Sequence, residues 1–288
     1  MAVTPPLEHT ALTLPAPAKL NLFLHVTGRR PDGYHTLESL VVPIDRADLI
    51  TLSLRDDDAV TRTHGAAGVA TDDDLAVLAA RLVQREFGVA RGVAIGVDKR
   101  VPMGAGLGGG SSDAATVLLG LNRMWRLGLS RATLMNLALK LGADVPFFVF
   151  GEPAFARGVG ERLEACSVPA TWFTVVAPPI HVPTSEIFAA TELTRDSESA
   201  KMPVFSEGYG RNDLQAVAVA RFQEIADALE ALRRVASEAG TRMTGSGACV
   251  LAAFANEQAA QQALSRLPRG MTGFVARALD RHPLWSFA

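Results

Sequence analysis

Hydrophobic and polar positions alternate over residues 18–26, close to the start of the chain. One side of the alternation is apolar and consists of Leu20, Leu22, Leu24 and Val26. The other side consists of Lys19, Asn21, Phe23 and His25. A period of two is typical of a β-strand with one face on the core. We therefore expect a strand that turns an ammonium, an amide and an imidazole toward a polar space, although a solvated sheet face would give the same pattern.

Strand-like and helical segments are mixed along the rest of the chain. Apolar residues spaced by three and four positions predict helices over residues 75–87, 114–125, 130–141, 222–239 and 256–267. Further strands are predicted over residues 37–54, 93–99, 173–177, 248–254 and 274–279. Residues 55–74 are polar and show no clear period. The order of these elements favours an α+β fold whose second half is a ferredoxin-like layer.

The periodic signal lapses between Pro153 and Pro169, so we predict a domain boundary in this stretch. One domain is expected over residues 1–165 and the other over residues 166–288. A chain of 288 residues is long enough for two domains of ordinary size, each with its own hydrophobic core.

Composition and charge exclude several classes of partner. The net charge of −2 argues against a nucleic acid or an anionic membrane as the main partner. No apolar run approaches the ~20 residues of a membrane span, and residues 1–14 lack the features of a signal or transit peptide. Cys166 and Cys249 lie far apart in small or apolar surroundings, which predicts reduced thiols rather than reactive ones. We expect a cytoplasmic protein; its oligomeric state is left open.

Five of the seven residues from Gly104 to Gly110 are glycine, directly before a helical pattern. Glycine permits positive φ and lets successive N–H groups converge on an anion, and the free N–H groups of a helix start attract the same charge. The segment therefore predicts a phosphate site, although a purely structural turn is the alternative. Its candidate residues are Lys99, Pro102, Met103, Gly104, Ala105, Gly106, Leu107, Gly108, Gly109, Gly110, Ser111 and Ser112.

The surrounding residues separate three kinds of nucleotide loop. A dinucleotide fold requires an acid about 20 residues after the loop, but no Asp or Glu occurs between Asp113 and Asp144. A Walker A loop requires lysine after its last glycine, where this chain has Ser111, and the His-Arg-Asp motif of protein kinases is missing. If the ligand is a nucleoside triphosphate, Ser111 or Ser112 could cap the helix, contact phosphate or bind Mg²⁺, so the metal ligands stay unassigned.

Five segments resemble the 4-diphosphocytidyl-2-C-methyl-D-erythritol kinase family. This family belongs to the superfamily of galactokinase, homoserine kinase, mevalonate kinase and phosphomevalonate kinase (GHMP). The segments are Pro17-Ala-Lys-Leu-Asn-Leu-Phe-Leu24, Asp32-Gly-Tyr-His35, residues 102–112, Leu141-Gly-Ala-Asp-Val-Pro146 and Thr244-Gly-Ser-Gly-Ala-Cys249. The glycine loop is common to the superfamily, whereas the first two strings are typical of this family.

The resemblance implies a two-domain GHMP-kinase-like fold with a mixed sheet and helices in the N-terminal domain. It also implies ATP and Mg²⁺ as cofactors, and phosphorylation of the tertiary 2-hydroxyl of a substrate that carries cytidine diphosphate, a step of the non-mevalonate route to isoprenoid precursors. The matching positions make Asp144 the general base and Lys19 its partner. The implied substrate-binding residues are Asn21, Tyr34, His35, Thr184 and Phe188, with the cytosine between Tyr34 and Phe188 and its edge at His35.

Three other functions remain open at this point. A kinase for another small alcohol, such as homoserine or mevalonate, would use the same loop. A nicotinamide-dependent oxidoreductase and a non-catalytic nucleotide-binding module belong to other classes. The chain departs from the family at Asp74, where an asparagine would usually help to read adenine, so the recognition of the nucleotide base is open as well.

Overall fold

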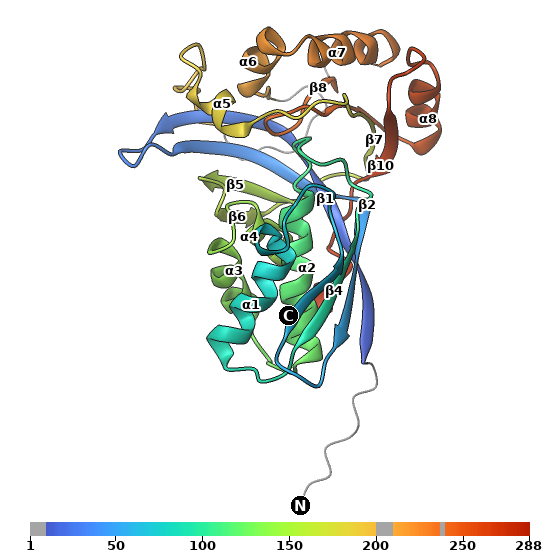
Figure 1. Cartoon of the computed structure of the whole chain (residues 1–288). Coiled ribbons are helices and arrows are strands. Elements are labelled where there is room, and N and C mark those ends of the chain that lie inside the picture. Colours follow the sequence, from blue (N-terminus) through green and yellow to red (C-terminus); the bar gives the residue numbers. More distant parts are fainter. Residues whose placement is uncertain (1–9, 200–209, 237–239) are drawn as a thin grey trace, which may run out of the picture.

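The computed structural model describes residues 10–199, 210–236 and 240–288, which form two layered parts, one below the other in Figure 1. The lower part is built on a six-stranded mixed sheet of order β3-β4-β2-β5-β6, with β1 paired to β2. Only the β3–β4 pair is parallel. The strands are β1 (Ala11–Arg29), β2 (His35–Leu54), β3 (Val60–His64), β4 (Val93–Asp98), β5 (Ala154–Gly158) and β6 (Arg162–Ala165).

Four helices and a short 3₁₀ turn accompany this sheet. They are α1 (Leu75–Phe87), α2 (Gly109–Met124), α3 (Arg131–Leu139), α4 (Val145–Phe150) and the turn Thr71–Asp73. The buried faces of α1 and α2 pack with sheet residues such as Ile50 and Ile95 in one hydrophobic core. None of the described helices has the length and apolar character needed to cross a membrane.

The upper part is a four-stranded antiparallel sheet of order β10-β7-β9-β8. Its strands are β7 (Trp172–Val176), β8 (Arg242–Met243), β9 (Val250–Phe254) and β10 (Gly273–Arg277). The helices α6 (Leu214–Arg221), α7 (Gln223–Val235) and α8 (Glu257–Ser265) lie above it, and α5 (Thr184–Ala189) lies over the β1–β2 hairpin (Figure 1). The order fourth-first-third-second strand is that of a ferredoxin-like layer, which confirms the predicted fold class. Residues 237–239 of the helix predicted over 222–239 lie outside the described residues.

The long strands β1 and β2 join the two parts. Along β1, Leu14 belongs to the core of the lower part, Leu20 to a middle core shared with β7 and β9, and Leu24 to the core under α6 and α7. Because β1 and β2 run through both parts, these two strands form one continuous wall of the cleft between them.

The predicted apolar residues Leu20, Leu22, Leu24 and Val26 are all buried, but Phe23 departs from its predicted polar face because of a β-bulge at Leu22. Asn21 pairs with Val41 and Phe23 pairs with Leu40, so one extra residue lies on β1 at this point. A one-residue shift exchanges the two faces of a strand. Phe23 consequently enters the middle core, where it is 1% exposed, and Leu24 lines the cleft instead.

Short elements occupy the stretches that showed no period. Residues 55–74 contain β3 and the 3₁₀ turn, so the expectation that this segment is irregular was wrong. As an edge strand beside β4 alone, β3 tolerates polar residues on both faces. Residues 153–169 hold β5 and β6. The first sheet ends at Ala165 and the second begins at Trp172, while Leu284 packs back into the lower core; the division at 165/166 stays a prediction.

Candidate active site

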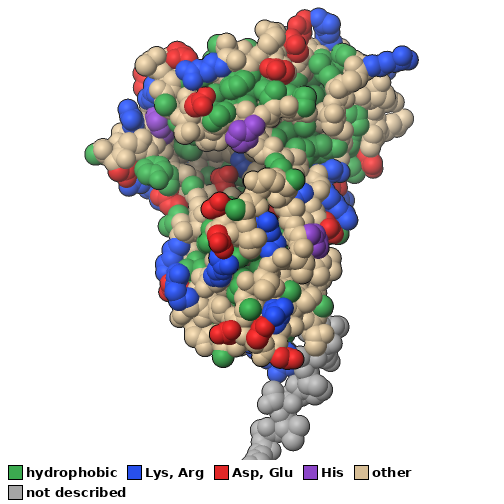
Figure 2. Space-filling view, in the orientation of Figure 1, with side chains coloured by type: hydrophobic (Ala, Val, Ile, Leu, Met, Phe, Trp, Pro, Cys, Tyr) green, Lys and Arg blue, Asp and Glu red, His purple; other side chains and the backbone are tan. Residues whose placement is uncertain are grey.

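The two parts enclose a cavity of about 680 Å³. The glycine loop, Lys19 and Asp144 line it from the lower part, whereas residues 181–184 and 245–246 line it from the upper part. The space-filling view shows the surface hollowed between the two parts (Figure 2). A pocket of this size suits a nucleotide together with part of a second small molecule.

The loop before α2 has the backbone conformation of a phosphate cradle. Gly104, Gly106 and Gly108 have φ values of +63°, +76° and +71°. A Cβ atom on Gly106 would lie 2.5 Å from the carbonyl oxygen of Thr244, so the backbone itself approaches the second part closely. The N–H groups in the first turn of α2 lack partners within the helix and lie at the cavity wall. This backbone conformation is compatible with an anion site, which stays a prediction.

Lys19 and Asp144 line the same cavity as this loop. Asp144 immediately precedes α4, and its Oδ2 lies 3.9 Å from Nζ of Lys19 rather than on the first N–H groups of α4. The carboxylate is 57% exposed and the lysine side chain 6%. The N–H of Lys19 also donates to the Leu107 carbonyl at 3.0 Å, which ties the ammonium-bearing strand to the glycine loop.

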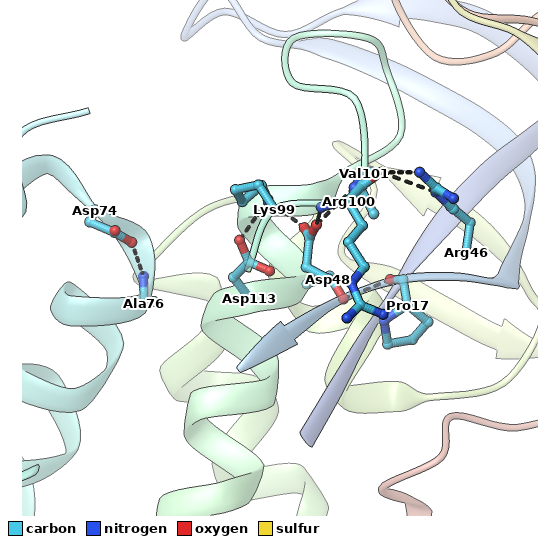
Figure 3. Close-up of polar contacts among 10 residues, drawn as sticks. Pro17, Arg46, Asp48, Asp74, Ala76, Lys99, Arg100, Val101 and Asp113 are labelled. Carbon is cyan, nitrogen blue, oxygen red and sulfur yellow. Dashed lines mark hydrogen bonds and ion pairs between the residues drawn. The ribbon is translucent and has the colours of Figure 1, made fainter. Parts of the chain in front are cut away.

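Lys99, predicted as a free cation for phosphate, is already bound to two carboxylates. Its Nζ donates to Asp48 and, at 2.8 Å, to Oδ2 of Asp113, as Figure 3 shows. Asp48 also accepts from the N–H groups of Arg100 and, at 2.8 Å, Val101. Burial raises the pKa of Asp113, although Lys99 opposes the rise. An ammonium has three donors, so Lys99 has one N–H left for a ligand and little net charge to offer.

The two serines at the start of α2 face different ways. Ser111 lines the cavity. Ser112 is fully buried; its hydroxyl donates to the Pro17 carbonyl at 2.6 Å and its N–H to the Gly108 carbonyl at 2.9 Å. The expectation that Ser112 could contact phosphate or Mg²⁺ is therefore corrected: its contacts fix α2 to β1.

The aromatic residues predicted for a cytosine are arranged differently from the expected sandwich. Phe188 stacks on His35 with ring centroids 5.1 Å apart and planes at 29°. Tyr34 lies in the β1–β2 turn and is 65% exposed. Nε of Arg195 donates to Nε2 of His35 at 3.0 Å, so the ring carries its proton on Nδ1. Burial and the charges of Arg195 and Arg29 lower the pKa of His35, which keeps the ring neutral.

Thr184 lies at the cavity in contact with a residue that the sequence analysis did not single out. Its Oγ1 lies 2.7 Å from Oγ of Ser246, in the turn between β8 and β9, and both residues line the cavity. His181 also lines it and packs against Gly104. Ser246 lies in the segment Thr244–Cys249 that resembles the family, but no role was assigned to it, and nothing in the sequence distinguished His181.

Asp74 lines the cavity, as do the apolar residues Val69, Leu75 and Val97. Oδ1 of Asp74 accepts from the Ala76 N–H at 3.0 Å and so caps α1, while Oδ2 accepts from Arg62 at 2.9 Å. Asp74, at the position where the family resemblance leads us to expect asparagine, thus caps α1 and forms an ion pair with Arg62.

The described residues include no group of three or more His, Cys, Asp or Glu side chains arranged to hold a metal ion. The two thiols also lie outside the cavity lining. Burial raises the pKa of Cys249 to about 12 and that of Cys166 to about 11. Both values fit the prediction of unreactive thiols.

Comparison with known proteins identifies relatives of this chain. Residues 74–152 match the GHMP kinases N terminal domain and residues 200–272 the GHMP kinases C terminal domain. The 4-diphosphocytidyl-2-C-methyl-D-erythritol kinase of Thiobacillus denitrificans is 57% identical over 95% of this chain and 97% of that protein. Its counterpart from Nitrosospira multiformis is 52% identical over 96% and 94%.

Solved structures give the same result. A crystal structure of 4-(cytidine 5'-diphospho)-2C-methyl-D-erythritol kinase superposes with a TM-score of 0.80 and 34% identity, and covers 93% of this chain and 99% of that one. Homoserine kinase from Cytophaga hutchinsonii has a TM-score of 0.68 at 16% identity, covering 98% of both chains. The second likeness concerns the fold alone.

Proposed function

The chain belongs to the 4-diphosphocytidyl-2-C-methyl-D-erythritol kinase family of the GHMP kinases, and we propose that it phosphorylates the tertiary 2-hydroxyl of 4-diphosphocytidyl-2-C-methyl-D-erythritol with ATP. One observation carries the proposal: the Lys19–Asp144 pair lines the same cavity as the glycine loop, and Lys19 lies directly against that loop. A phosphoryl donor and an alcohol acceptor can therefore be held together between them.

The two charged side chains would act on the acceptor hydroxyl. Asp144 would accept its proton, and the ammonium of Lys19 would orient the carboxylate and stabilise charge on the transferred group. The loop N–H groups would hold the triphosphate in line. Because phosphoryl transfer has a loose transition state, positioning and charge neutralisation should contribute more than proton removal.

When bound, Mg²⁺ would supply positive charge that neutralises the phosphate oxygens. Oxygen donors are the ligands that Mg²⁺ prefers, and Ser111 and Asp144 place a hydroxyl and a carboxylate at the cavity. These two residues are the candidates for holding the ion. Lys99 would direct its remaining N–H at the nucleotide beside Gly109, whose added Cβ would lie 3.2 Å from Nζ.

The far end of the substrate would bind where α5 lies over the β1–β2 hairpin (Figure 1). Nδ1–H of His35 is a donor that suits the acceptor atoms of a cytosine edge. Phe188 and Tyr34 would supply aromatic surfaces for the base, and Thr184 and Asn21 would contact the remainder of the substrate. In this assignment residues 1–165 bind ATP and residues 166–288 complete the substrate cleft.

A coupled assay of ADP release tests the reaction and the substrate together. ADP should appear with ATP and 4-diphosphocytidyl-2-C-methyl-D-erythritol, and not with mevalonate or homoserine. Comparable turnover of mevalonate or homoserine would indicate another small-alcohol kinase. Fluorescence titration with NADH examines the oxidoreductase alternative, for which saturable binding would be required.

A further inference from the structure

The hydrogen bonds around Lys19 form a chain that ends at Ser39 on β2. Nζ of Lys19 donates to Oδ1 of Asn21, and Nδ2 of Asn21 donates to Oγ of Ser39 at 2.8 Å. Ser39 Oγ in turn donates to the Phe23 carbonyl at 2.5 Å. Lys19, Asn21 and Ser39 are 5%, 6% and 4% exposed, so water has little access to these bonds.

The chemistry of the last acceptor fixes the direction of the whole chain. A carbonyl oxygen can only accept, so the Phe23 carbonyl takes the single hydroxyl proton of Ser39. The oxygen of Ser39 can then only accept a hydrogen bond from Asn21, so the donor must be Nδ2 of the amide. Asn21 must therefore turn Oδ1 toward the ammonium of Lys19. The two ends of an amide have nearly the same shape, so the hydrogen bonds are what distinguish them.

The β-bulge at Leu22 lets two residues of β1 contact one side chain of β2. Asn21 lies before the bulge and Phe23 after it, yet both form hydrogen bonds with the side chain of Ser39. The backbone N–H of Asn21 is also held, at 2.8 Å from Oγ1 of Thr244 in the upper part. The position of Asn21 is thus fixed by its backbone, and its amide orientation by Ser39 together with Lys19, whose ammonium can only donate.

We propose that Ser39 is a positioning residue for Lys19, acting through the orientation of the Asn21 amide. This inference rests on the proposed function, in which Lys19 acts with Asp144. If the amide rotated, Nδ2 would face the ammonium, and the two donors would repel each other. Lys19 would then leave its place 3.9 Å from Asp144. Loss of the Ser39 hydroxyl therefore lowers turnover more than it lowers the affinity for either substrate.

The first test compares variants that keep or remove the hydroxyl. Ser39→Ala should lower kcat about tenfold, the usual consequence of leaving a buried polar group without its partner, with each KM changed by less than about threefold. Ser39→Thr keeps the hydroxyl and should restore most of the loss. Ser39→Val has the shape of threonine without the hydroxyl, so the Thr/Val pair supplies the same comparison if the alanine variant folds poorly. Ser53→Ala, on the same strand, is the matched control.

A double-mutant cycle separates this route from a direct or merely structural role. In Asn21→Asp the side chain has two equivalent acceptor oxygens and cannot present a donor to Lys19. Adding Ser39→Ala to Asn21→Asp should therefore change kcat by less than about twofold, because the amide on which Ser39 acts is gone. A further tenfold loss in that background, a threonine variant as slow as alanine, or unchanged kcat in Ser39→Ala would overturn the proposal.

A spectroscopic measurement keeps the inference separate from the proposed function. The side-chain amide signals of Asn21, assigned by their absence in Asn21→Asp, should shift in Ser39→Val and stay near their original positions in Ser39→Thr. If the wild-type protein released no ADP, the proposed function would fail while this amide test still stood. Unchanged amide signals in Ser39→Val would refute the orientation argument even in an active enzyme.

Discussion

Asp144 is the residue whose chemistry can be tested most directly. Its carboxylate is exposed to the cavity and lies beside Lys19. Replacing Asp144 by Asn keeps the shape and removes the base, so kcat should fall about 10²- to 10⁴-fold in the coupled assay. Asp227→Asn, an exposed carboxylate change on α7, should leave kcat unaltered. Near-normal turnover by Asp144→Asn would remove this residue from the role of general base.

Tyr34 gives a second prediction at this scale. Its ring is 65% exposed at the β1–β2 turn, next to the stacked His35. If the ring covers the cytosine, Tyr34→Ala should raise the KM for the cytidine substrate about tenfold or more, as expected for a lost base–aromatic stack, with a smaller effect on kcat. Phe87→Ala removes another exposed aromatic ring, on α1, and serves as the control. An unchanged KM in Tyr34→Ala would refute the stacking.

Some of these residues could be predicted from sequence and others could not. Lys19 and Asp144 lie in short strings typical of the family, and the structure brings them together. Asp48 and Ser39 are ordinary polar residues of a strand, and their contacts depend on partners far away in the sequence. The Asn21 N–H and its acceptor Thr244, for example, are 223 positions apart. No local pattern encodes such a pair, because only the packing of the two parts creates it.

Within the glycine loop the glycines are not equivalent. A Cβ on Gly106 would meet the Thr244 carbonyl at 2.5 Å, and its φ of +76° is costly for other residues. Gly106→Ala should therefore lower the melting temperature by roughly 5 °C or more. In Gly110, within α2, the nearest atom to an added Cβ is Leu75 Cδ1 at 3.8 Å. Gly110→Ala should raise the melting temperature slightly, because alanine favours a helix by about 0.5–1 kcal/mol.

Differential scanning calorimetry of both alanine variants would check this contrast. Equal melting temperatures for Gly106→Ala and Gly110→Ala would mean that the loop can move away from Thr244, and that its close contact with the upper part is not a constraint.

Elements with a strong period were predictable, and short ones were not. The helices α1 and α3 bury one face and expose the other, so their apolar spacing indicated them. The helix α2 is buried over residues 112–122, and its larger apolar side chains still recur at helical spacing. The helix α4 has six residues, Val145–Phe150, all of them apolar, and therefore shows no period of its own. The edge strand β3 is polar on both faces. Its existence depends on β4 beside it rather than on its own sequence.

At the scale of the whole molecule, the residues after β10 form hydrogen bonds with the lower part. The His282 N–H donates to the Gly151 carbonyl at 2.7 Å, just after α4. Nδ1 of His282 accepts from the Leu284 N–H at 3.0 Å, so the ring is neutral with its proton on Nε2. Burial, followed by the charge of Arg131, lowers the pKa of His282 to about 4.

This histidine predicts a pH dependence of stability. Between pH 6.5 and about 4 the unfolded chain takes up a proton that folded His282 refuses, so its contribution to stability is lost as the pH falls through this window. The expected loss by pH 4 is roughly 3 kcal/mol. His282→Asn keeps an acceptor for the Leu284 N–H without titrating. Its melting temperature should fall less steeply on acidification than that of the wild type.

Thermal melts at several pH values provide the measurement. His64→Asn, which changes an imidazole that is 53% exposed, is the control and should show the wild-type slope. Identical slopes for His282→Asn and the wild type would show that the buried ring does not govern acid sensitivity.

The order of strands and helices was sufficient to predict an α+β molecule with a ferredoxin-like second part. The connection between the parts was not predictable, because β1 and β2 look like ordinary amphipathic strands. In the structure they run through three cores, and the chain returns to the first part after completing the second.

That return has a consequence for synthesis in the cell. A ribosome releases the segment that carries Asp144 long before it releases His282 and Trp285, whose contacts secure the end of α4 through the Gly151 carbonyl and Arg131. A nascent chain can thus form its nucleotide loop early but can complete the surroundings of its proposed base only after His282 and Trp285 have emerged. Termination of translation before residue 282 should consequently yield polypeptides that contain both Lys19 and Asp144 and are still inactive in the ADP-release assay.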